Sequence, residues 1–507
     1  MDLEPRPLTG TDRVQLLVMI AAGYLSATYF AEFWFFSPAR RHPVYFALLS
    51  FAIFWGIYRS LINWYIYFFI TPPPPRATTR SYQVDVLTTA MPGEPFAMFE
   101  QTLTAIQSMR HPHRCFLLDG GNDPALRALC ERLGVQHIDC TGVGGAKAGK
   151  INHCLQHHGR GEIVLVIDPD HRPRPDLLDR ALPWFDDDRI GFVQVVQAYY
   201  NTGESFIAEG AAEETFGFYG PTQMGLNGLG IATAIGANCI FRRAALDSIG
   251  GHAVHLAEDA LTSMRLHAQG WRSVYLPYRG SSGLVPADLR SFFKQQFKWS
   301  AGMFYLLFRE YPRLFRRFDA AARPHYFFAG TFYFGGLATF LTLVLPIWFL
   351  FFRVFAVEFE LREFALHLLP YAAAVFLSHV FAQRWYTHSS ERRFPWRSLV
   401  LEKATWHVYL MGLISGVLNR KVEYLPTPKG SDRASMPRLV LPNLAIIALS
   451  AAAIAFALLT YPRLDDGTLL MIAFAAINIA LLTPVTWVAL FPRWNWRGQA
   501  LDVHGTA

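Results

Sequence analysis

Residues 162–171 read EIVLVIDPDH, and this stretch decides the fold of the central part of the chain. Its apolar, β-branched first half predicts a buried strand over Glu162–Ile167. Asp168 and Asp170 follow where the strand ends, and two carboxylates two residues apart can bind one hard cation. Mg²⁺ or Mn²⁺ would complete such a site with phosphate oxygens and water. The alternative is a solvated acidic turn, because Asp and Pro are common in turns.

Strand-like and helix-like runs alternate on the amino-terminal side of this stretch. The predicted elements are strands over Val84–Thr88, Cys115–Leu118 and Val135–Asp139, and helices over Phe96–Met109, Pro124–Leu133 and Ile151–His157. This alternation predicts an α/β domain with a parallel sheet and helices on both faces. Such sheets bind their ligands beyond the carboxyl ends of the strands. Asp119 is expected there, together with Asp168 and Asp170.

Long apolar runs on both sides of this region predict a membrane protein. Of the 507 residues, 52% are hydrophobic and only 17% are charged, whereas soluble proteins have about 25% charged residues. A membrane span needs about 20 largely uncharged residues. Six charge-free runs reach or approach this length: Val14–Ala31, Pro43–Tyr58, Tyr326–Phe352, Phe364–Gln383, Leu439–Pro462 and Gly467–Pro492.

Basic residues indicate the orientation of these runs. Residues 384–438 contain ten Lys and Arg, which marks the segment between the fourth and fifth runs as cytoplasmic. Six spans then place both termini and the central domain in the cytoplasm, although Arg40 and Arg41 in the first external loop count against this orientation. Membrane flanks account for the net charge of +7. No stretch is strongly basic and interleaved with aromatic residues, so nucleic acid is not an expected partner.

Two further helices are expected at the cytoplasmic interface of the membrane. Ala404–Asn419 has 16 residues without charge, about 24 Å as a helix, which is too short for a hydrocarbon core of about 30 Å. Asp288–Met303 is predicted to be an amphipathic helix. The predicted division of the chain is two spans in 1–75, a cytosolic domain in 76–320, two spans in 321–386, an interface helix and loop in 387–438, and two spans in 439–507.

Two other motifs carry charged candidates. The glycine-rich segment Gly144–Lys150 resembles a P-loop but has Ile151 where that motif needs Ser or Thr. Its Lys147 can still contact an anionic nucleotide, and the alternative is a solvated basic turn. Ala257-Glu258-Asp259 opens a predicted helix, where the helix dipole alone favours carboxylates. The functional interpretation makes Asp259 a general base.

Seven motifs, in this order and spacing, resemble those of membrane-integrated family 2 glycosyltransferases. The resemblance is strongest to bacterial cellulose synthases and other processive β-glucan synthases, which make cellulose, curdlan or mixed-linkage glucans. The motifs are Val84-Asp85, Leu118-Asp119-Gly120-Gly121, Ala146-Lys147-Ala148-Gly149, Asp168-Pro-Asp170-His171, Phe218-Tyr219-Gly220, Ala257-Glu258-Asp259 and Gln295-Gln-Phe-Lys298-Trp299. The resemblance implies a GT-A domain with a Rossmann-like α/β fold, inserted in a bundle of about six transmembrane helices with amphipathic interface helices.

The resemblance also implies roles on the donor side of an active site. Asp85 and Asp119 would hold the uridine and its ribose, and Lys147 would lie near the nucleotide. Mg²⁺ or Mn²⁺, bridging the diphosphate, would be carried by Asp168 and Asp170, with His171 beside it.

On the acceptor side, the resemblance makes Asp259 the base that deprotonates the acceptor hydroxyl, with Glu258 next to it. Gln295, Lys298 and Trp299 would form a platform for acceptor and diphosphate. The family usually has Arg where this chain has Lys298, which replaces a planar fork by a point charge. It has Phe-Cys-Gly-Ser where this chain has Ala234-Ile235-Gly236-Ala237, so the linkage stays open.

A loop after the interface helix resembles the gating loop of cellulose synthases. It reads Tyr424-Leu-Pro-Thr427-Pro-Lys429-Gly430, and the resemblance implies that Thr427 and Lys429 contact the diphosphate when the loop closes. The alternative is a rigid, proline-rich connector. About 15 residues follow Pro492, too few for a cyclic-dinucleotide-binding domain, so no regulation by cyclic di-GMP is expected within this chain.

Together these features predict a processive, inverting glycosyltransferase in the bacterial inner membrane. It would polymerise a UDP-sugar, with UDP-glucose as the expected donor, into a β-linked polysaccharide and translocate the product. The expected partners are the donor, the growing polysaccharide, the lipid bilayer and accessory secretion subunits. The alternatives are a non-processive enzyme with a lipid acceptor, and a transport or scaffold protein with an inactive transferase domain. The intact Asp168, Asp170 and Asp259 argue against the last of these.

Overall fold

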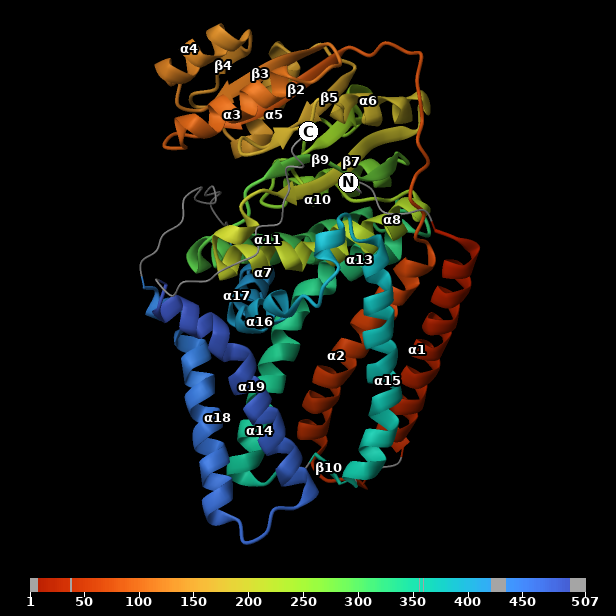
Figure 1. The fold of residues 1–507 in the computed structure, drawn as a ribbon, viewed down its shortest axis with the longest axis vertical. Coiled ribbons are helices and arrows are strands. Elements are labelled where there is room, and N and C mark those ends of the chain that lie inside the picture. Colours follow the sequence, from red (N-terminus) through yellow and green to blue (C-terminus); the bar gives the residue numbers. More distant parts are fainter. Residues whose placement is uncertain (1–7, 37–38, 355, 359, 421–434, 493–507) are drawn as a thin grey trace.

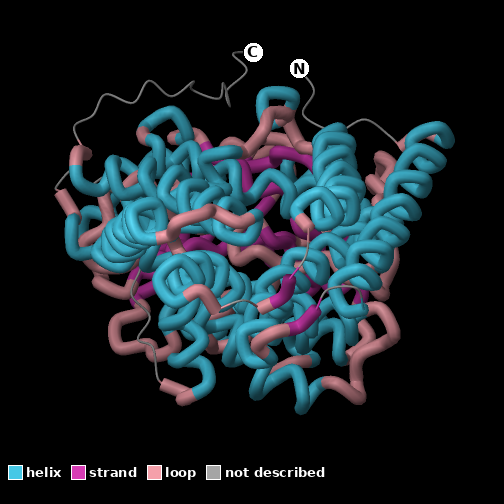
Figure 2. The backbone as a smooth tube through the Cα atoms, turned by 90° about the horizontal axis from the view of Figure 1, so that it is seen from below, coloured by secondary structure: helices cyan, strands magenta, loops and turns pink. Residues whose placement is uncertain are grey.

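The computed structural model describes residues 8–36, 39–354, 356–358, 360–420 and 435–492. An α/β domain built around one large sheet sits on top of a bundle of long helices, and a layer of shorter helices lies between them (Figure 1). Viewed from the bundle end, helices cover most of the strands (Figure 2). Thr427 and Lys429, the predicted gating-loop residues, fall outside the described part of the chain.

The sheet has eight strands in the order β4-β3-β2-β5-β8-β7-β9-β6. The first four, β4 (Gln136–Asp139), β3 (His113–Asp119), β2 (Val84–Ala90) and β5 (Ile163–Val166), are parallel, as predicted. The other four are β8 (Cys239–Arg242), β7 (Ile190–Tyr199), β9 (Arg272–Gly283) and β6 (Arg172–Pro173).

The sheet is not parallel throughout, because β8 runs antiparallel to both β5 and β7. Just before β8, Gly236 and Asn238 have φ of 78° and 56°. These left-handed residues turn the chain back at the carboxyl edge of the parallel strands. They therefore bring residues 236–238 close to the end of β5, beside Asp168.

Helices cover both faces of the sheet, as predicted. On one face, α3 (Phe96–Gln107) and α4 (Pro124–Leu133) pack on residues such as Val86 and Leu165. On the other, α5 (Ala146–His157), α9 (Arg243–Ser248) and α10 (Glu258–Ala268) pack on residues such as Leu87 and Val166. Alternate residues of each strand point to opposite faces, so β2 and β5 are buried on both sides.

Within the described ranges of the chain, six helices are long and apolar enough to cross a membrane, which indicates a multi-pass membrane protein. They are α1 (Gly10–Phe36), α2 (Pro43–Phe68), the continuous run Ala322–Phe352 that includes α13 (Ala322–Thr331) and α14 (Gly335–Phe352), the run Leu361–Trp385 that contains α15 (Leu361–Ala382), the run Pro437–Thr460 with α18 (Leu441–Thr460), and α19 (Asp466–Leu490). The number agrees with the prediction. α2 continues past Arg59, whose guanidinium lies 4.5 Å from the centre of the Phe332 ring.

The interface layer consists of α7 (Phe206–Gly217), α11 (Leu289–Tyr305), α16 (Trp396–Ala404) and α17 (Trp406–Val417) (Figure 1). The predicted interface helices correspond to α11 and α17. These two pack closely, because a Cβ atom on Gly412 or Gly416 would collide with Ser300 or Phe304 of α11. α17 is therefore held against α11, and α11 carries the Gln295–Trp299 motif.

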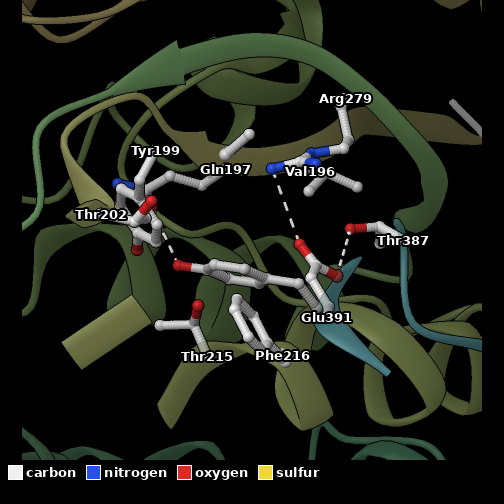
Figure 3. Close-up of a pocket in the computed structure, with 11 residues that line it drawn as sticks. Val196, Gln197, Tyr199, Thr202, Thr215, Phe216, Arg279, Thr387 and Glu391 are labelled. Atoms are coloured by element: carbon white, nitrogen blue, oxygen red, sulfur yellow. Dashed lines mark hydrogen bonds and ion pairs between the residues drawn. The ribbon is translucent and has the colours of Figure 1, made fainter. Parts of the chain in front are cut away.

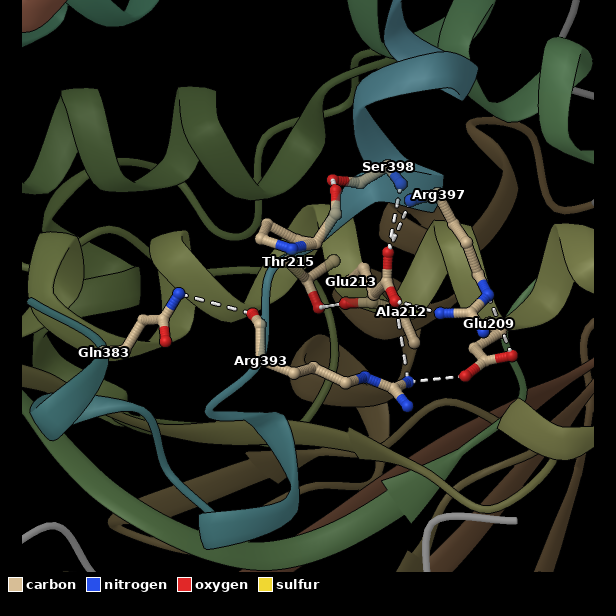
Figure 4. A network of polar contacts seen from close by, with 9 residues as sticks. Glu209, Ala212, Glu213, Thr215, Gln383, Arg393, Arg397 and Ser398 are labelled. Atoms are coloured by element: carbon tan, nitrogen blue, oxygen red, sulfur yellow. Dashed lines mark hydrogen bonds and ion pairs between the residues drawn. The ribbon is translucent and has the colours of Figure 1, made fainter. Parts of the chain in front are cut away.

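Buried ion pairs fasten the connector, defined here as residues 383–403, to α7 (Figure 4). Arg393 lies 2.6 Å from the carboxylate of Glu209, and Arg397 lies 2.9 Å from that of Glu213. Glu213 also accepts hydrogen bonds from the backbone N–H groups of Arg397 and Ser398, at 2.9 and 3.2 Å. The two carboxylates are buried, so their charges depend on these partners.

A second buried pair joins the connector to the sheet. Glu391 lies 3.6 Å from Arg279 of β9 and accepts a hydrogen bond from Thr387 at 3.1 Å, at the edge of a small cavity (Figure 3). The connector thus holds the end of the fourth span against both α7 and β9. Ion pairs therefore connect the membrane bundle to the α/β domain, in addition to the covalent chain.

Removing one partner from this clamp should be costly. Replacement of Glu213 by Ala removes the nearest carboxylate of Arg397 and leaves only Glu209, at 3.1 Å, so we expect a loss of about 3 kcal/mol, the lower end of the range for breaking a buried pair. Glu100→Ala is the matched control, because Glu100 pairs with Arg132 at 2.6 Å on the surface and such pairs contribute about 0–1 kcal/mol. Denaturant unfolding in detergent micelles measures both; equal losses would contradict a structural role for the clamp.

Candidate active site

Asp168, Asp170 and His171 form a group of potential metal ligands at the carboxyl end of β5. One ligand atom from each lies within 4.8 Å of the others. His171 Nδ1 is 3.2 Å from Asp170 Oδ1, and the backbone N–H of Leu284 donates to Asp170 Oδ2 at 3.3 Å. The buried Nε2 of His171 has no hydrogen-bond partner among the described residues. Two carboxylates and an imidazole suit a divalent cation such as Mg²⁺ or Mn²⁺.

Lys147 connects this group to the residues before β8. Its ammonium group contacts the carboxylate of Asp168 and the carbonyl oxygen of Gly236. The side chain is only 8% exposed, so the alternative of a solvated basic turn is wrong. The glycine-rich motif instead forms the first turn of α5, which begins at Ala146, five residues before the predicted start. Gly149 is required there because a Cβ atom would collide with the Gly144 carbonyl.

Asp259 lies at the amino-terminal end of α10, close to Gly236. A Cβ atom on Gly236 would lie 3.1 Å from Asp259 Oδ2, so glycine leaves room beside this oxygen. The other oxygen, Oδ1, accepts a hydrogen bond from the backbone N–H of Ala260 at 2.7 Å. Burial raises the pKa of Asp259 above its ordinary value, and the charge of Asp168 adds to the increase while Lys147 opposes it. Burial and the charge of Asp259 raise the pKa of Glu258 to about 7.

The raised pKa of Asp259 gives a testable pH dependence. A general base works only when deprotonated, so the rate falls about tenfold per pH unit below its pKa. We expect the acid limb of the kcat/KM profile to lie above pH 3.9, the ordinary pKa of aspartate, because burial favours the protonated carboxyl. The measurement is kcat/KM for the donor from pH 4 to 9, and a profile that stays flat down to pH 4 would contradict this expectation.

Asp119 lies at the carboxyl edge, as predicted. It ends β3 and accepts hydrogen bonds from the backbone N–H groups of Gly121 and Asp123, at 2.8 and 2.7 Å. His137 Nε2 is 3.0 Å from its second oxygen. Asp119 therefore orders the loop that follows β3, next to Lys150, which donates to the carbonyl oxygen of Ala90 at 2.6 Å.

The structure places Asp85 away from this edge and corrects its predicted role in uridine binding. Asp85 is the second residue of β2, near the amino end of the strand, and is fully buried. Its carboxylate pairs with Arg114 on the neighbouring strand at 2.6 Å and accepts the Gly161 N–H at 2.6 Å. Because it is buried near the amino end of β2 and paired with Arg114, Asp85 stabilises the fold.

The motif residues Gln295, Lys298 and Trp299 lie on α11, at spacings that place them on one side of the helix. Trp299 is exposed, and the other two are partly exposed. Whether they hold an acceptor or diphosphate stays a prediction.

A polar chain next to this motif was not anticipated from the sequence. Gln296 donates to Glu214 of α7 at 2.8 Å and accepts a hydrogen bond from Tyr409 of α17 at 3.1 Å. Burial, together with the charge of Glu402, raises the pKa of Glu214 to about 8. The available signal was the presence of three glutamates in the otherwise apolar, small-residue helix α7. These hydrogen bonds join α7, α11 and α17 at one point.

Residues 163–380 match the family model described as glycosyl transferase family group 2. Among curated proteins, the chain is 32% identical over 245 residues to the UDP-forming cellulose synthase catalytic subunit of Komagataeibacter sucrofermentans, covering 46% of this chain and 32% of that protein. It is 26% identical over 378 residues to the corresponding subunit of Pseudomonas fluorescens, covering 72% of this chain and 50% of that protein. The chain thus spans half or less of the length of these relatives.

Among solved structures, a mannosyltransferase from Pyrobaculum calidifontis, in complex with GDP-mannose and Mn²⁺, superposes with a TM-score of 0.50. The match covers 74% of this chain and 100% of that chain at 16% identity. At this identity the likeness concerns the fold alone. It confirms the predicted GT-A-like α/β domain, which the six candidate spans flank.

Proposed function

We propose that this chain is a cellulose synthase-like family 2 glycosyltransferase that polymerises glucose from UDP-glucose into a β-linked glucan and translocates the product. In the proposed reaction, a hydroxyl group of the growing polysaccharide attacks the anomeric carbon of the donor sugar. The proposed location is the bacterial inner membrane with the α/β domain in the cytoplasm, which the basic residues around the connector support.

The single observation that carries this proposal is the position of Lys147 between two acidic groups. Its ammonium group contacts both Asp168 and the Gly236 carbonyl, and Gly236 in turn packs beside Asp259. A potential cation site and a potential base therefore lie beside the same short segment. Inverting transfer needs both groups near one anomeric carbon, a base for the attacking hydroxyl and a positive charge for the leaving diphosphate.

Each residue then has a defined task. Asp259 Oδ2 accepts the proton of the acceptor hydroxyl, whose oxygen forms the new bond to the anomeric carbon as the bond to the diphosphate oxygen breaks. Asp168 and Asp170, with His171 beside them, would hold Mg²⁺ or Mn²⁺, which would neutralise negative charge on the departing diphosphate. Lys147 adds a fixed positive charge on the same side.

The interface layer supports processive synthesis. α11 carries Trp299 and is held by α17 and α7, which lie against the membrane bundle (Figure 1). A polymer bound on this layer would be close to the helices through which it must leave.

The test is a polymerisation assay on the full chain in nanodiscs with radiolabelled UDP-glucose, UDP-N-acetylglucosamine, UDP-galactose and GDP-mannose. We expect a high-molecular-weight product from UDP-glucose that is degraded by β-glucanases. Linkage-specific glucanases then distinguish β-1,4, β-1,3 and mixed linkages. A single labelled sugar on a lipid would identify a non-processive enzyme instead, and incorporation of another sugar would reject glucose.

Trp299 provides a test of processivity. An exposed indole offers a flat apolar face on which a sugar ring can stack, and Trp299 is exposed on α11. We expect Trp299→Ala to shorten the polymer several-fold at an unchanged unfolding temperature. Trp348→Ala, which removes an exposed indole from the spanning helix α14, is the matched control. Unchanged product length in the Trp299 variant would assign this side chain to lipid contact.

A further inference from the structure

The segment between α11 and the third span carries a strong positive charge. It comprises η4 (Leu306–Glu310), α12 (Tyr311–Leu314) and the turn that leads to Ala322. We call residues 308–323 the arginine turn. Its five arginines are all exposed: Arg309, Arg313, Arg316, Arg317 and Arg323. Contrary to the expectation from the sequence, this stretch is strongly basic and interleaved with aromatic residues.

The two acidic residues of the arginine turn do not neutralise it. Glu310 is buried and pairs with Arg313 at 2.9 Å. Asp319 accepts the backbone N–H groups of Ala321 and Ala322 at 3.0 and 2.7 Å, at the start of α13.

Three of the arginines point to an external partner. Arg309, Arg316 and Arg317 make no side-chain hydrogen bond or ion pair within the described ranges of the chain, and their side chains are exposed. Arg323, by contrast, donates to the carbonyl oxygen of Phe315 at 3.2 Å. Three guanidinium groups are therefore available, each with its planar set of N–H donors.

Exposed aromatic rings lie among these arginines. Phe308, Phe315 and Phe327 are 37–44% exposed, which is unfavourable in water for side chains of this size. Tyr311 lies between two of them, with its ring 5.7 Å from Phe315 and 6.0 Å from Phe327. Aromatic rings of this kind are enriched at the level where lipid headgroups meet the hydrocarbon core.

The arginine turn directly precedes the third span, and this position also places it at the level of the lipid headgroups. The run Ala322–Phe352 has 31 residues, about 46 Å of helix, whereas the hydrocarbon core is about 30 Å thick. Part of this run therefore extends beyond the hydrocarbon core, and its first turns, on the side of the α/β domain, are expected among the headgroups. The arginine turn directly precedes them, on the side of the α/β domain (Figure 1).

We propose that the arginine turn is a binding site for anionic phospholipid headgroups of the leaflet that faces the α/β domain. The phosphate diester would be bound by the guanidinium groups of Arg309, Arg316 and Arg317, because the planar fork of arginine matches phosphate oxygens. Phe308, Phe315 and Phe327 insert beside the acyl chains. The site anchors the junction between α11 and the third span to the membrane surface.

The test measures binding of a fluorescent phosphatidylglycerol to the full chain in neutral detergent micelles, with fluorescent phosphatidylcholine as the comparison lipid. We expect tighter binding of phosphatidylglycerol and a loss of this preference in high salt. Arg316→Gln/Arg317→Gln should raise the apparent Kd for phosphatidylglycerol about 25-fold, about five-fold for each arginine, and leave phosphatidylcholine binding unchanged. Arg316→Lys/Arg317→Lys, which keeps the charge but loses the planar fork, should raise the apparent Kd less than the Gln pair does.

Arg110→Gln/Arg160→Gln is the matched control, with the same change in net charge. Both residues are exposed and follow the carboxyl ends of α3 and α5, at the edge of the sheet opposite the active site. The control should bind phosphatidylglycerol like the wild type. Equal losses in the two pairs would reveal a general charge effect and overturn the proposal. So would an absence of preference for phosphatidylglycerol, which would leave an acidic protein or a nucleic acid as the partner.

Discussion

Asp259→Asn should lower the rate of sugar transfer by about 10²–10⁴-fold, the usual contribution of a general base. The substitution preserves the shape of the side chain and its place at the start of α10 but removes its basicity. Oδ2 faces the opening left by Gly236, so this position loses its proton acceptor. Donor binding should persist, since the proposed donor contacts come from Asp119, Lys147 and the Asp168 group.

Glu258→Gln is the matched control for this experiment. The two carboxyl groups are neighbours at the same helix end and both have raised pKa values. Removing the charge of Glu258 should lower the pKa of Asp259 and shift the acid limb of the pH profile to lower pH, with a much smaller effect on the maximal rate. Rates come from initial incorporation of labelled sugar, and donor binding from calorimetry. If the Gln variant were inactive and the Asn variant active, the base would be Glu258.

Loss of the cation should have an effect of similar or greater size. We expect Asp170→Ala, or excess chelator, to reduce sugar transfer at least about 10³-fold, because a divalent cation contributes several kcal/mol to stabilisation of the leaving group. Asp170 is buried, and its carboxylate lies close to the carboxylate of Asp168 and the imidazole ring of His171. Addition of Mg²⁺ or Mn²⁺ to the chelated wild type should restore activity and show which ion is preferred.

Asp188→Ala is the control for this variant. The Asp188 carboxylate is 80% exposed and precedes the amino end of β7, at the edge of the sheet opposite Asp168. Its activity should equal that of the wild type. Unfolding temperature and membrane insertion of Asp170→Ala should also be unchanged, which separates loss of the cation from loss of the fold. Full activity in excess chelator would remove the metal from the mechanism.

Elements with local signals were predicted closely. α4 was predicted over the residues that form it, because Asp123 caps its first turn by accepting the Ala125 N–H at 2.8 Å and Gly134 ends it with a φ of 68°. The membrane spans depend only on the length and composition of apolar runs. Their ends were underestimated because charged residues such as Arg59 can be accommodated by packing on aromatic rings.

Errors arose where the backbone of one segment depends on a distant one. The start of α5 was missed because glycine has a low helix propensity. In the folded chain, the close approach of Gly149 to the Gly144 carbonyl requires a glycine at this position of the helix. Asp85 was assigned to the nucleotide because its motif fits the family. Its real partner, Arg114, is opposite it in the β2–β3 register, and the register cannot be read from either strand alone.

Composition and periodicity were sufficient to predict the α/β class of the central domain, the six spans and the carboxylates at the end of β5. Each of these features depends on the hydrophobicity and the secondary-structure propensity of residues that are adjacent in the sequence. Only the folded chain showed that β8 reverses, that Lys147 contacts Asp168, and that Arg393 reaches Glu209, which is 184 residues away. Such pairings depend on how whole helices and strands pack. Burying a charge costs free energy because it loses its water, and only an oppositely charged partner, here supplied by a distant segment, compensates for this loss.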